Sequence, residues 1–451
     1  MAAGMASESV EQGDKVTLRV IVDKGRNQVV YAEAGKDFVD VLFSFLTLPL
    51  GTIARLVAKE SNIEAVRFGS ISSIYESVSD LDQQHLWSHN CKEMLLNPRN
   101  SMEDHYKHLK LNIDDTPLQL FMCEDKSCRS CVSIFSNQKC HCGKLLKTDV
   151  HLIYQKGFVK ESATFIIQDD LNVMPNDLGT SLCLLQKRGI NNIADIEKKM
   201  ILVGKKEVAD LLKLSLLSKT PLSDFVLKRK PILCNLNQNF EPKIKIENGL
   251  PSSDSDEGKQ MVVKVIRRTS NGKILFATAE EDFADILFSF LTFPLGAVLQ
   301  MLEGFSSISC MDCLYRSIKE LSPDRCLRSQ ELKDKLIKPD IFPNFELRRQ
   351  ILAIETFELT WNSQRLDFID PKSPISGGYA KGPLTIMVTD DLIVTPMSSI
   401  DAISYLERMN VPLNDIEEIV LNIGKNEGLS ILKASLTSTS VLTNSLNQYI
   451  G

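Results

Sequence analysis

The chain has 451 residues, of which 43% are hydrophobic and 24% charged, a composition typical of globular proteins. Its net charge of −6 argues against a broad positive surface for nucleic acid or an anionic membrane. No apolar stretch is long enough to span a bilayer, and residues 1–15 lack the apolar core of a signal peptide. We therefore expect a cytoplasmic protein, with the nucleus as the alternative compartment and no membrane partner. Its 11 cysteines are then thiols or metal ligands rather than disulfides.

The folded part of the chain begins with the signature of a β-hairpin. Val16 to Val22 and Gln28 to Ala32 are rich in strand-forming residues, and the segment DKGRN between them has turn chemistry. A second hairpin is predicted from Val262 to Ile266 and from Lys273 to Ala277. The dipeptide Asn271-Gly272 is the turn signal between these two strands.

Each hairpin leads into nearly the same apolar motif. Asp37 to Gly51 reads DFVDVLFSFLTLPLG, and Asp282 to Gly296 reads DFADILFSFLTFPLG, so 12 of 15 positions are identical. Polar residues recur at helical spacing in the first motif, at Asp37, Asp40, Ser44 and Thr47. This pattern predicts a helix that is buried on most of its circumference and capped at its start by Asp37. We expect the polar stripe to be a solvent edge or a capping network. The proline near the end of each motif ends the helix and begins a second one.

Later segments also recur. A third helix is predicted around Ile71 and again around Met311, and a strand from Gln350 to Thr356. Further on, strands that end in Asp-Asp are each followed by a turn and a short strand. In the second copy a helix capped by Ser398, a strand and a last helix complete the pattern, over 399–409, 416–423 and 426–437.

These patterns predict an α+β fold made of two tandem repeats, each a small mixed sheet packed on helices. The first repeat carries a zinc-ribbon-like insertion. The predicted boundaries are 1–14 for a disordered N-terminus, 15–227 for the first repeat domain with a Cys-rich insertion at 121–147, 228–260 for a disordered linker, and 261–448 for the second repeat domain.

The insertion holds the best candidate for a site. Cysteines crowd into twenty residues, with one histidine among them, at Cys123, Cys128, Cys131, Cys140, His141 and Cys142. Zinc needs four such donors in a tetrahedron at about 2.0–2.3 Å. The turn at Cys140 resembles a zinc knuckle with one residue deleted, and Val132 to Phe135 with the turn after it would supply a hairpin. Cys128 and Cys131 have the commoner knuckle spacing. Four protein ligands leave no open position, so the predicted site is structural.

The hairpin, the motif at 32–52, the Cys cluster, the Asp-Asp strands and the terminal helix around Ile431 to Leu436 resemble the plant family named for domain of unknown function 674. The resemblance covers nearly the whole chain outside the linker and the termini, and implies a protein of tandem copies whose biochemical role is unassigned. It also suggests that Cys123 and Cys128 form the first ligand pair. The predicted metal ligands are then Cys123, Cys128, Cys140 and Cys142, with Cys131 or His141 as a substitute ligand.

Other candidate sites have simpler interpretations. Asp169-Asp170 and Asp390-Asp391 could bind a divalent cation or share a proton, but Asp-Asp between apolar strands is also turn chemistry, which we favour. Gly424-Lys425 could hold an anion at a helix start, where a plain helix entry is favoured. All histidines precede residue 152, so no activity shared by both copies can use a histidine base.

The sequence leaves three functions open. The first is a non-enzymatic interaction or scaffold protein with a structural zinc and with protein partners. The second is nucleic-acid binding through the Cys-rich hairpin, helped by nearby basic residues, at Lys126, Arg129, Lys139, Lys144 and Lys147. The third is a small-molecule or enzymatic role at the Asp-Asp strand ends. We favour the first, which assigns no catalytic residue and no cofactor besides zinc.

Overall fold

The computed structural model describes residues 15–116, 119–125, 127–128, 130–136, 138–150, 156–229, 260–343, 347, 349–352, 354–361, 364–372 and 377–450. The predicted N-terminal segment 1–14 and most of the predicted linker lie outside these residues. No helix within the described ranges has the length and apolar character needed to cross a membrane.

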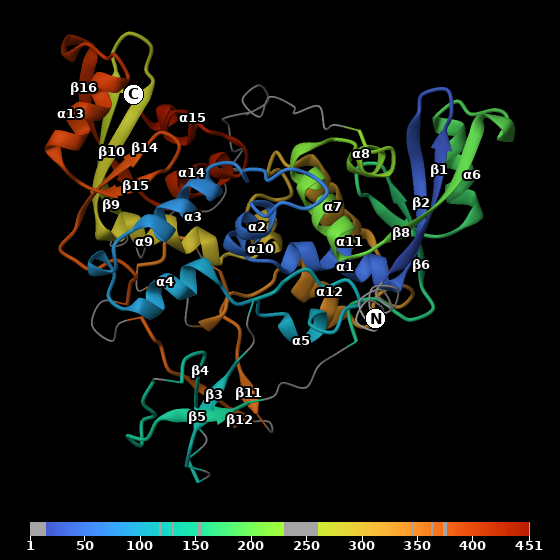
Figure 1. Ribbon diagram of the computed structural model, residues 1–451, viewed down its shortest axis with the longest axis horizontal. Coiled ribbons are helices and arrows are strands. Elements are labelled where there is room, and N and C mark those ends of the chain that lie inside the picture. The colour runs from blue at the N-terminus through green and yellow to red at the C-terminus, as the bar shows by residue number, and fades with distance from the viewer. Residues whose placement is uncertain are drawn as a thin grey trace, which may run out of the picture.

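Two five-stranded antiparallel sheets with the same strand order form the ends of the molecule (Figure 1). The first has the order β7-β6-β2-β1-β8, and the second β15-β14-β10-β9-β16. Their bounds are β1 (Val16–Asp23), β2 (Gln28–Gly35), β6 (Thr164–Gln168), β7 (Val173–Pro175), β8 (Ile196–Val203), β9 (Met261–Arg268), β10 (Ile274–Glu280), β14 (Thr385–Thr389), β15 (Val394–Pro396) and β16 (Ile416–Ile423). Both predicted hairpins and both predicted Asp-Asp strands are confirmed.

Helices fill the space between the two sheets (Figure 1). They are α1 (Lys36–Thr47), α2 (Leu50–Val57), α3 (Ile71–Asp80), α4 (His89–Leu96), α5 (Glu103–Tyr106), α7 (Lys205–Leu217), α8 (Pro221–Val226), α9 (Glu281–Ser289), α10 (Leu295–Met301), α11 (Ser309–Glu320), α12 (Gln330–Ile337), α14 (Lys425–Thr437) and α15 (Val441–Leu446). Two more, α6 (Leu178–Lys187) and α13 (Ser399–Arg408), follow the short strands β7 and β15. The Ser398 hydroxyl caps α13 as predicted, accepting the Asp401 N–H at 3.3 Å.

The two copies of the apolar motif meet at the centre of the molecule. Pro49 and Pro294 form an antiparallel bridge, because the Leu50 N–H donates to the Phe293 carbonyl and the Leu295 N–H to the Leu48 carbonyl, both at 2.9 Å. We call the two sheets and the helices between them the body, and the parts before and after residue 230 the first and second halves.

The helix α1 is more deeply buried than its polar stripe suggests. Asp40, Ser44 and Thr47 are all buried, so the predicted solvent edge is wrong. The alternative, a capping network, is not found either, because no side chain among the described residues caps the start of α1 and the Ser44 and Thr47 hydroxyls donate to carbonyls of their own helix. The Asp40 carboxylate accepts the N–H groups of Phe158 and Val159 at 2.8 and 2.9 Å. The predicted cap at Asp37 is also wrong, because the helix begins at Lys36 and Asp37 lies within its first turn.

Each half packs a helix against the other half's sheet. The Ser77 hydroxyl on α3 accepts the N–H of Val394 in β15 at 2.9 Å, and the Ser317 hydroxyl on α11 accepts the N–H of Val173 in β7 at 2.8 Å. One continuous hydrophobic cluster contains buried residues of both halves. The division into repeat domains at 15–227 and 261–448 stays a prediction, and the packing adds that the halves share a core.

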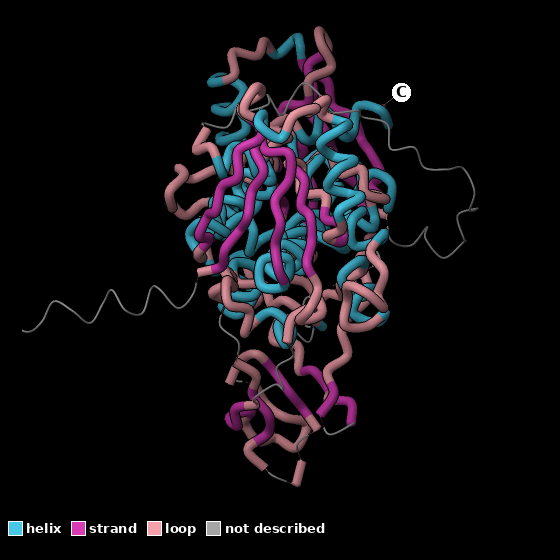
Figure 2. Tube along the Cα trace, turned by 90° about the vertical axis from the view of Figure 1, so that its right-hand side faces the viewer, coloured by secondary structure: helices cyan, strands magenta, loops and turns pink. Residues whose placement is uncertain are grey.

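A third sheet projects from the body (Figure 2), and its strands and turns contain the clustered cysteines predicted as metal ligands. We call it the Cys-rich sheet; its order is β13-β4-β3-β5, with bounds β3 (Phe121–Cys123), β4 (Cys131–Ser133), β5 (Leu146–Asp149) and β13 (Asp367–Phe368). The second half supplies β13, and a short hairpin of β11 (Thr360–Trp361) and β12 (Gln364–Arg365) precedes it. The insertion predicted for the first half is therefore completed by the second half.

Two strand predictions in these divergent segments are wrong. The described part of Gln350 to Thr356 forms no strand, because Ile351 and Leu352 bury their side chains in the shared core without a strand partner, and Thr356 makes only an isolated bridge. The predicted hairpin from Val132 is replaced by β4, which pairs with β3 and β13. Part of its turn, Asn137, lies outside the described residues.

Candidate metal centre

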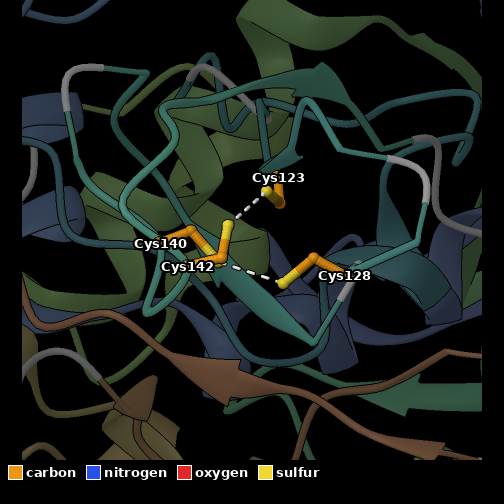
Figure 3. A group of neighbouring side chains, drawn as sticks. All are labelled: Cys123, Cys128, Cys140 and Cys142. Carbon is orange, nitrogen blue, oxygen red and sulfur yellow. Dashed lines mark hydrogen bonds between the residues drawn. The ribbon is translucent and has the colours of Figure 1, made fainter.

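Two turns of the Cys-rich sheet bring four cysteines to one point. Cys123 ends β3, and Cys128 lies in the turn that follows it. Cys140 and Cys142 lie in the second turn, before β5. Their side chains point toward one another (Figure 3). These are the four residues predicted as the main ligand set, and the fold gathers them from two segments.

The backbone of the second turn is tightly fixed. The Cys140 N–H donates to the Lys144 carbonyl at 2.8 Å, and the Gly143 N–H donates to the Cys140 carbonyl at 2.9 Å. Gly143 has a φ of 84°, in the left-handed region that glycine adopts without steric cost. The sequence of this turn therefore sets the direction in which its two thiols point.

The four sulfur atoms have the spacing of a tetrahedral site. All four Sγ atoms lie within 4.8 Å of one another, and the pairs Cys123–Cys142 and Cys128–Cys140 are both 3.4 Å apart. These distances are too long for a disulfide bond of about 2.05 Å. Zinc–sulfur bonds of about 2.3 Å place tetrahedral sulfur ligands about 3.8 Å apart. The cluster can therefore hold one metal ion of this size after small side-chain adjustments.

Backbone N–H groups stabilise thiolates at three of the four positions. The Asp125 N–H lies 3.4 Å from the Cys123 Sγ, and the N–H groups of Ser130 and Cys142 donate in the same way to Cys128 and Cys140. In each pair the donor lies two residues after the acceptor. Such bonds favour the charged thiolate, which is the form that binds metal.

The thiols differ in their acidity. Hydrogen bonds, first of all from the Ser130 hydroxyl, lower the pKa of Cys128 to about 7. Burial raises the pKa of Cys123 and Cys140, whose side chains form the small core of this sheet. Thiols with raised pKa values become thiolates at neutral pH only when a cation compensates their desolvation. This arrangement is typical of a site organised around a metal ion.

The two substitute ligands take a different place. Cys131 and His141 lie with Asp367 in a second group, whose ligand atoms are all within 4.8 Å of one another. Sequence patterns gave no indication of Asp367, which reaches this group through the pairing of β13 with β4. The sequence feature that points toward a contact with Asp367 is that both copies diverge after the third helix, so that two insertions leave the fold at equivalent points.

The Asp-Asp strand ends are engaged within the protein. Asp169 accepts the Ser223 N–H and hydroxyl, both at 2.7 Å, and the Gln28 amide at 2.9 Å. Asp390 accepts the Thr443 N–H and hydroxyl at 2.8 and 3.0 Å. Burial raises the pKa of Asp169, and that of Asp390 to about 6. The favoured interpretation as turn residues agrees with these contacts, which tie each turn to the helix α8 or α15.

A small hollow does lie beside one of these turns. Its volume is about 210 Å³, and its lining includes Asp390, Asp391 and Lys273. Gly424 and Lys425 do not line it, so it does not join the acids to the predicted anion turn. At that turn the Glu427 carboxylate already accepts the Gly424 N–H at 2.9 Å.

The basic residues of the Cys-rich sheet are partly neutralised. The Lys144 ammonium pairs with the Asp125 carboxylate at 2.8 Å, and acidic residues such as Asp149 and Asp367 share the same sheet. Lys126 and Arg129 lie outside the described residues.

A family model described as "Protein of unknown function (DUF674)" matches residues 12–426. The chain belongs to this family. The match confirms the family suggested by the duplicated motif, whereas the plant origin and the tandem copies stay predictions. Comparison with curated proteins and with solved structures gives no match. Membership in DUF674 therefore brings no reaction and no known site, and the function has to be argued from the geometry of this chain.

Proposed function

We propose that this chain is a non-enzymatic interaction protein of the cytoplasm, in which a structural zinc ion at Cys123, Cys128, Cys140 and Cys142 holds the Cys-rich sheet together. Four thiolates complete the coordination of zinc and leave no position for a substrate, which is the pattern of structural sites. The small core on the cysteine side of this sheet consists largely of thiols, so the ion would replace a conventional hydrophobic core there, whereas Met122 and Val132 of the same strands belong to the main hydrophobic cluster.

The buried acids support a non-enzymatic role. Asp40, Asp169, Asp285 and Asp390 all accept hydrogen bonds from backbone N–H groups of the same chain. A carboxylate held in this way contributes to the fold, because its lone pairs already have partners. These acids have the geometry of clamps between segments.

The observation that carries the interaction role is an end strand with exposed apolar side chains at each end of the molecule. β8 and β16 are the end strands of their sheets, each with eight residues. Met200 and Leu202 on β8 are 76% and 61% exposed, and Val420 on β16 is 57% exposed. End strands with exposed apolar side chains are the usual site for adding a further strand. We propose an extended segment of a partner protein as the occupant.

The halves present these end strands in the same structural context, which supports their origin as tandem copies. The helices α6 and α13 cover only part of the outer faces, and the first sheet is seen from this side in Figure 2. Two equivalent strands at opposite ends would let one chain bind two partner segments at once and so act as a scaffold.

Elemental analysis of the purified chain tests the zinc site. We expect Cys142→Ser to lose the ion of the four-thiol site, whereas Cys183→Ser, an exposed cysteine on α6, leaves zinc content unchanged. Absence of zinc from the wild-type protein, or full retention by Cys142→Ser, would contradict the proposal.

Affinity capture tests the interaction role. We expect the double variant Leu202→Lys and Val420→Lys to lose partner proteins that the wild-type chain retains, because lysine blocks strand addition at an edge. Leu178→Lys and Ile400→Lys, at exposed apolar positions of α6 and α13 away from the end strands, provide a matched control. Binding of RNA or DNA that falls steeply with salt and is abolished by Cys140→Ser would instead support the nucleic-acid alternative.

A further inference from the structure

Beside the four-thiol cluster lies a second group of potential metal ligands with a different chemistry. It contains a thiol, an imidazole and a carboxylate, from Cys131, His141 and Asp367. Their ligand atoms all lie within 4.8 Å of one another. Cys131 packs against Cys123 and Cys140 in the small core of this sheet, but its two partners, His141 and Asp367, take no part in the four-thiol cluster.

The fold assembles this group from three separate segments. Cys131 begins β4, and its register partner in the parallel pair is Asp367 in β13. The pairing is fixed by two backbone hydrogen bonds, from the Asp367 N–H to the Ser130 carbonyl at 2.8 Å and from the Ile369 N–H to the Val132 carbonyl at 2.9 Å. His141 reaches the same point from the turn between the ligands Cys140 and Cys142. The position of all three therefore follows from backbone structure.

The contacts within the group leave room for an ion. The Nδ1 atom of His141 lies 3.9 Å from the Oδ2 atom of Asp367, which is too long for a hydrogen bond. Tetrahedral nitrogen and oxygen ligands of zinc lie about 3.3 Å apart, with bonds of about 2.0 Å to the metal. The side chains of His141 and Asp367 are 68% and 63% exposed, so they can rotate to close this gap. Cys131 is fully buried and provides the fixed side of the group.

We propose that Cys131, His141 and Asp367 form a second site for a divalent cation of the zinc class, with water as its fourth ligand. Thiolate and imidazole select zinc-like ions over magnesium or calcium, and three protein ligands leave one position open on the solvent side. The site also differs from the four-thiol cluster in the origin of its ligands. Its carboxylate comes from the second half of the chain, so the ion joins the two insertions that make up the Cys-rich sheet.

Metal content and coordination of the full-length protein under reducing conditions test this site. With excess zinc removed by gel filtration or weak competitors, the wild-type chain should retain about two ions. His141→Ala and Asp367→Asn should each retain about one, while Cys142→Ser loses the other ion. X-ray absorption should report mixed sulfur and nitrogen or oxygen ligands in the wild type, and sulfur alone in His141→Ala. His89→Ala and Asp195→Asn, both at exposed positions, are matched controls that keep wild-type values.

The outcomes separate the two sites. A wild-type chain with one ion and only sulfur ligands would overturn the second site and leave the first in place. Two ions retained by both His141→Ala and Asp367→Asn would also overturn it, because neither side chain would then be needed. Because both substitutions lie at exposed side chains, circular dichroism should show an intact fold in each variant, so a lost ion reports a lost ligand.

Discussion

The two halves of the chain repeat a backbone arrangement but differ in how they neutralise its buried acid. Asp40 on α1 and Asp285 on α9 each clamp two backbone N–H groups, those of Phe158 and Val159 and those of Tyr379 and Ala380. In the first half, the Lys36 ammonium also pairs with Asp40 at 2.6 Å. In the second half, the corresponding position is Glu281, which accepts the Leu384 N–H at 3.1 Å.

The difference shows which part of the arrangement the fold requires. Both halves keep the hydrogen bonds that tie the central helix to the segment before the Asp-Asp strand, whereas a lysine one turn before the acid on the same helix is present only in the first half. Burial therefore raises the pKa of Asp285 to about 7, even though Lys372 lies near enough to oppose the shift. Burial also raises the pKa of Asp40, against the opposing effect of Lys36.

Separating the halves would test how far they depend on each other, and should have the largest effect. We expect residues 15–229 and 260–450, produced alone, to lack a cooperative thermal transition. Each piece would lose one helix that packs against its sheet, α11 for the first half and α3 for the second, at a cost of roughly 1.5–3 kcal/mol for each large apolar side chain exposed. Produced together, the pieces should associate and recover the transition measured by circular dichroism. A sharp transition in either isolated half would show that the shared core is dispensable.

Metal removal would test the four-thiol cluster, whose cysteines all come from the first half. With a strong chelator we expect the Cys-rich sheet to lose its hydrogen-exchange protection over residues 119–150, because its small core cannot replace the ion. The body should keep its protection and its thermal transition, since its core contains no part of the four-thiol cluster. Loss of protection throughout the chain would instead place the ion at the centre of the whole fold.

Local patterns predicted much of the body and the crowding of cysteines in one insertion, because hairpins, apolar helices and closely spaced cysteines are encoded within short segments. The choice of Cys123 with Cys128 as the first ligand pair came from the family resemblance. The predictions that failed depend on contacts with distant parts of the chain. At Gln350 to Thr356 the apolar residues signal burial, and a strand and a buried loop leave the same local pattern. Asp367 enters the metal region through a parallel pair with a strand more than 200 residues earlier. Pairing at such separation leaves no trace in either segment alone.

Replacing Asp40 and Asp285 with asparagine would compare how the charge of each buried acid affects stability. An acid whose pKa is raised in the folded state binds its proton more tightly there, so its contribution to stability is lost as pH rises through that pKa. For Asp285 the affected range runs from about pH 4 to about pH 7, with a change of about 4 kcal/mol. Asp285→Asn should remove this part of the pH dependence and stabilise the protein at pH 8.

Asp40→Asn should also stabilise the protein at pH 8, but by less than Asp285→Asn. The pKa of Asp40 is raised as well, and the loss of the charged partner of Lys36, whose side chain is 11% exposed, offsets part of the gain. Denaturant unfolding from pH 4 to pH 8 measures both variants on the same scale. Equal shifts of the same sign would show that the counter-charge on Lys36 makes no difference.

The serines that join each helix to the opposite sheet provide the smallest and most symmetrical test. Ser77→Ala removes the acceptor of the buried Val394 N–H, and Ser317→Ala removes that of the Val173 N–H. An unsatisfied buried N–H costs about 1–3 kcal/mol, so we expect similar losses for both. Ser289→Ala is the control, since its hydroxyl donates only to the Ile286 carbonyl of its own helix. If urea unfolding gave the control the same loss as the two variants, the contacts between the halves would contribute nothing specific. Within this range Ser317→Ala should lose slightly more than Ser77→Ala, because its hydroxyl also lies 2.9 Å from the Asn172 side-chain oxygen.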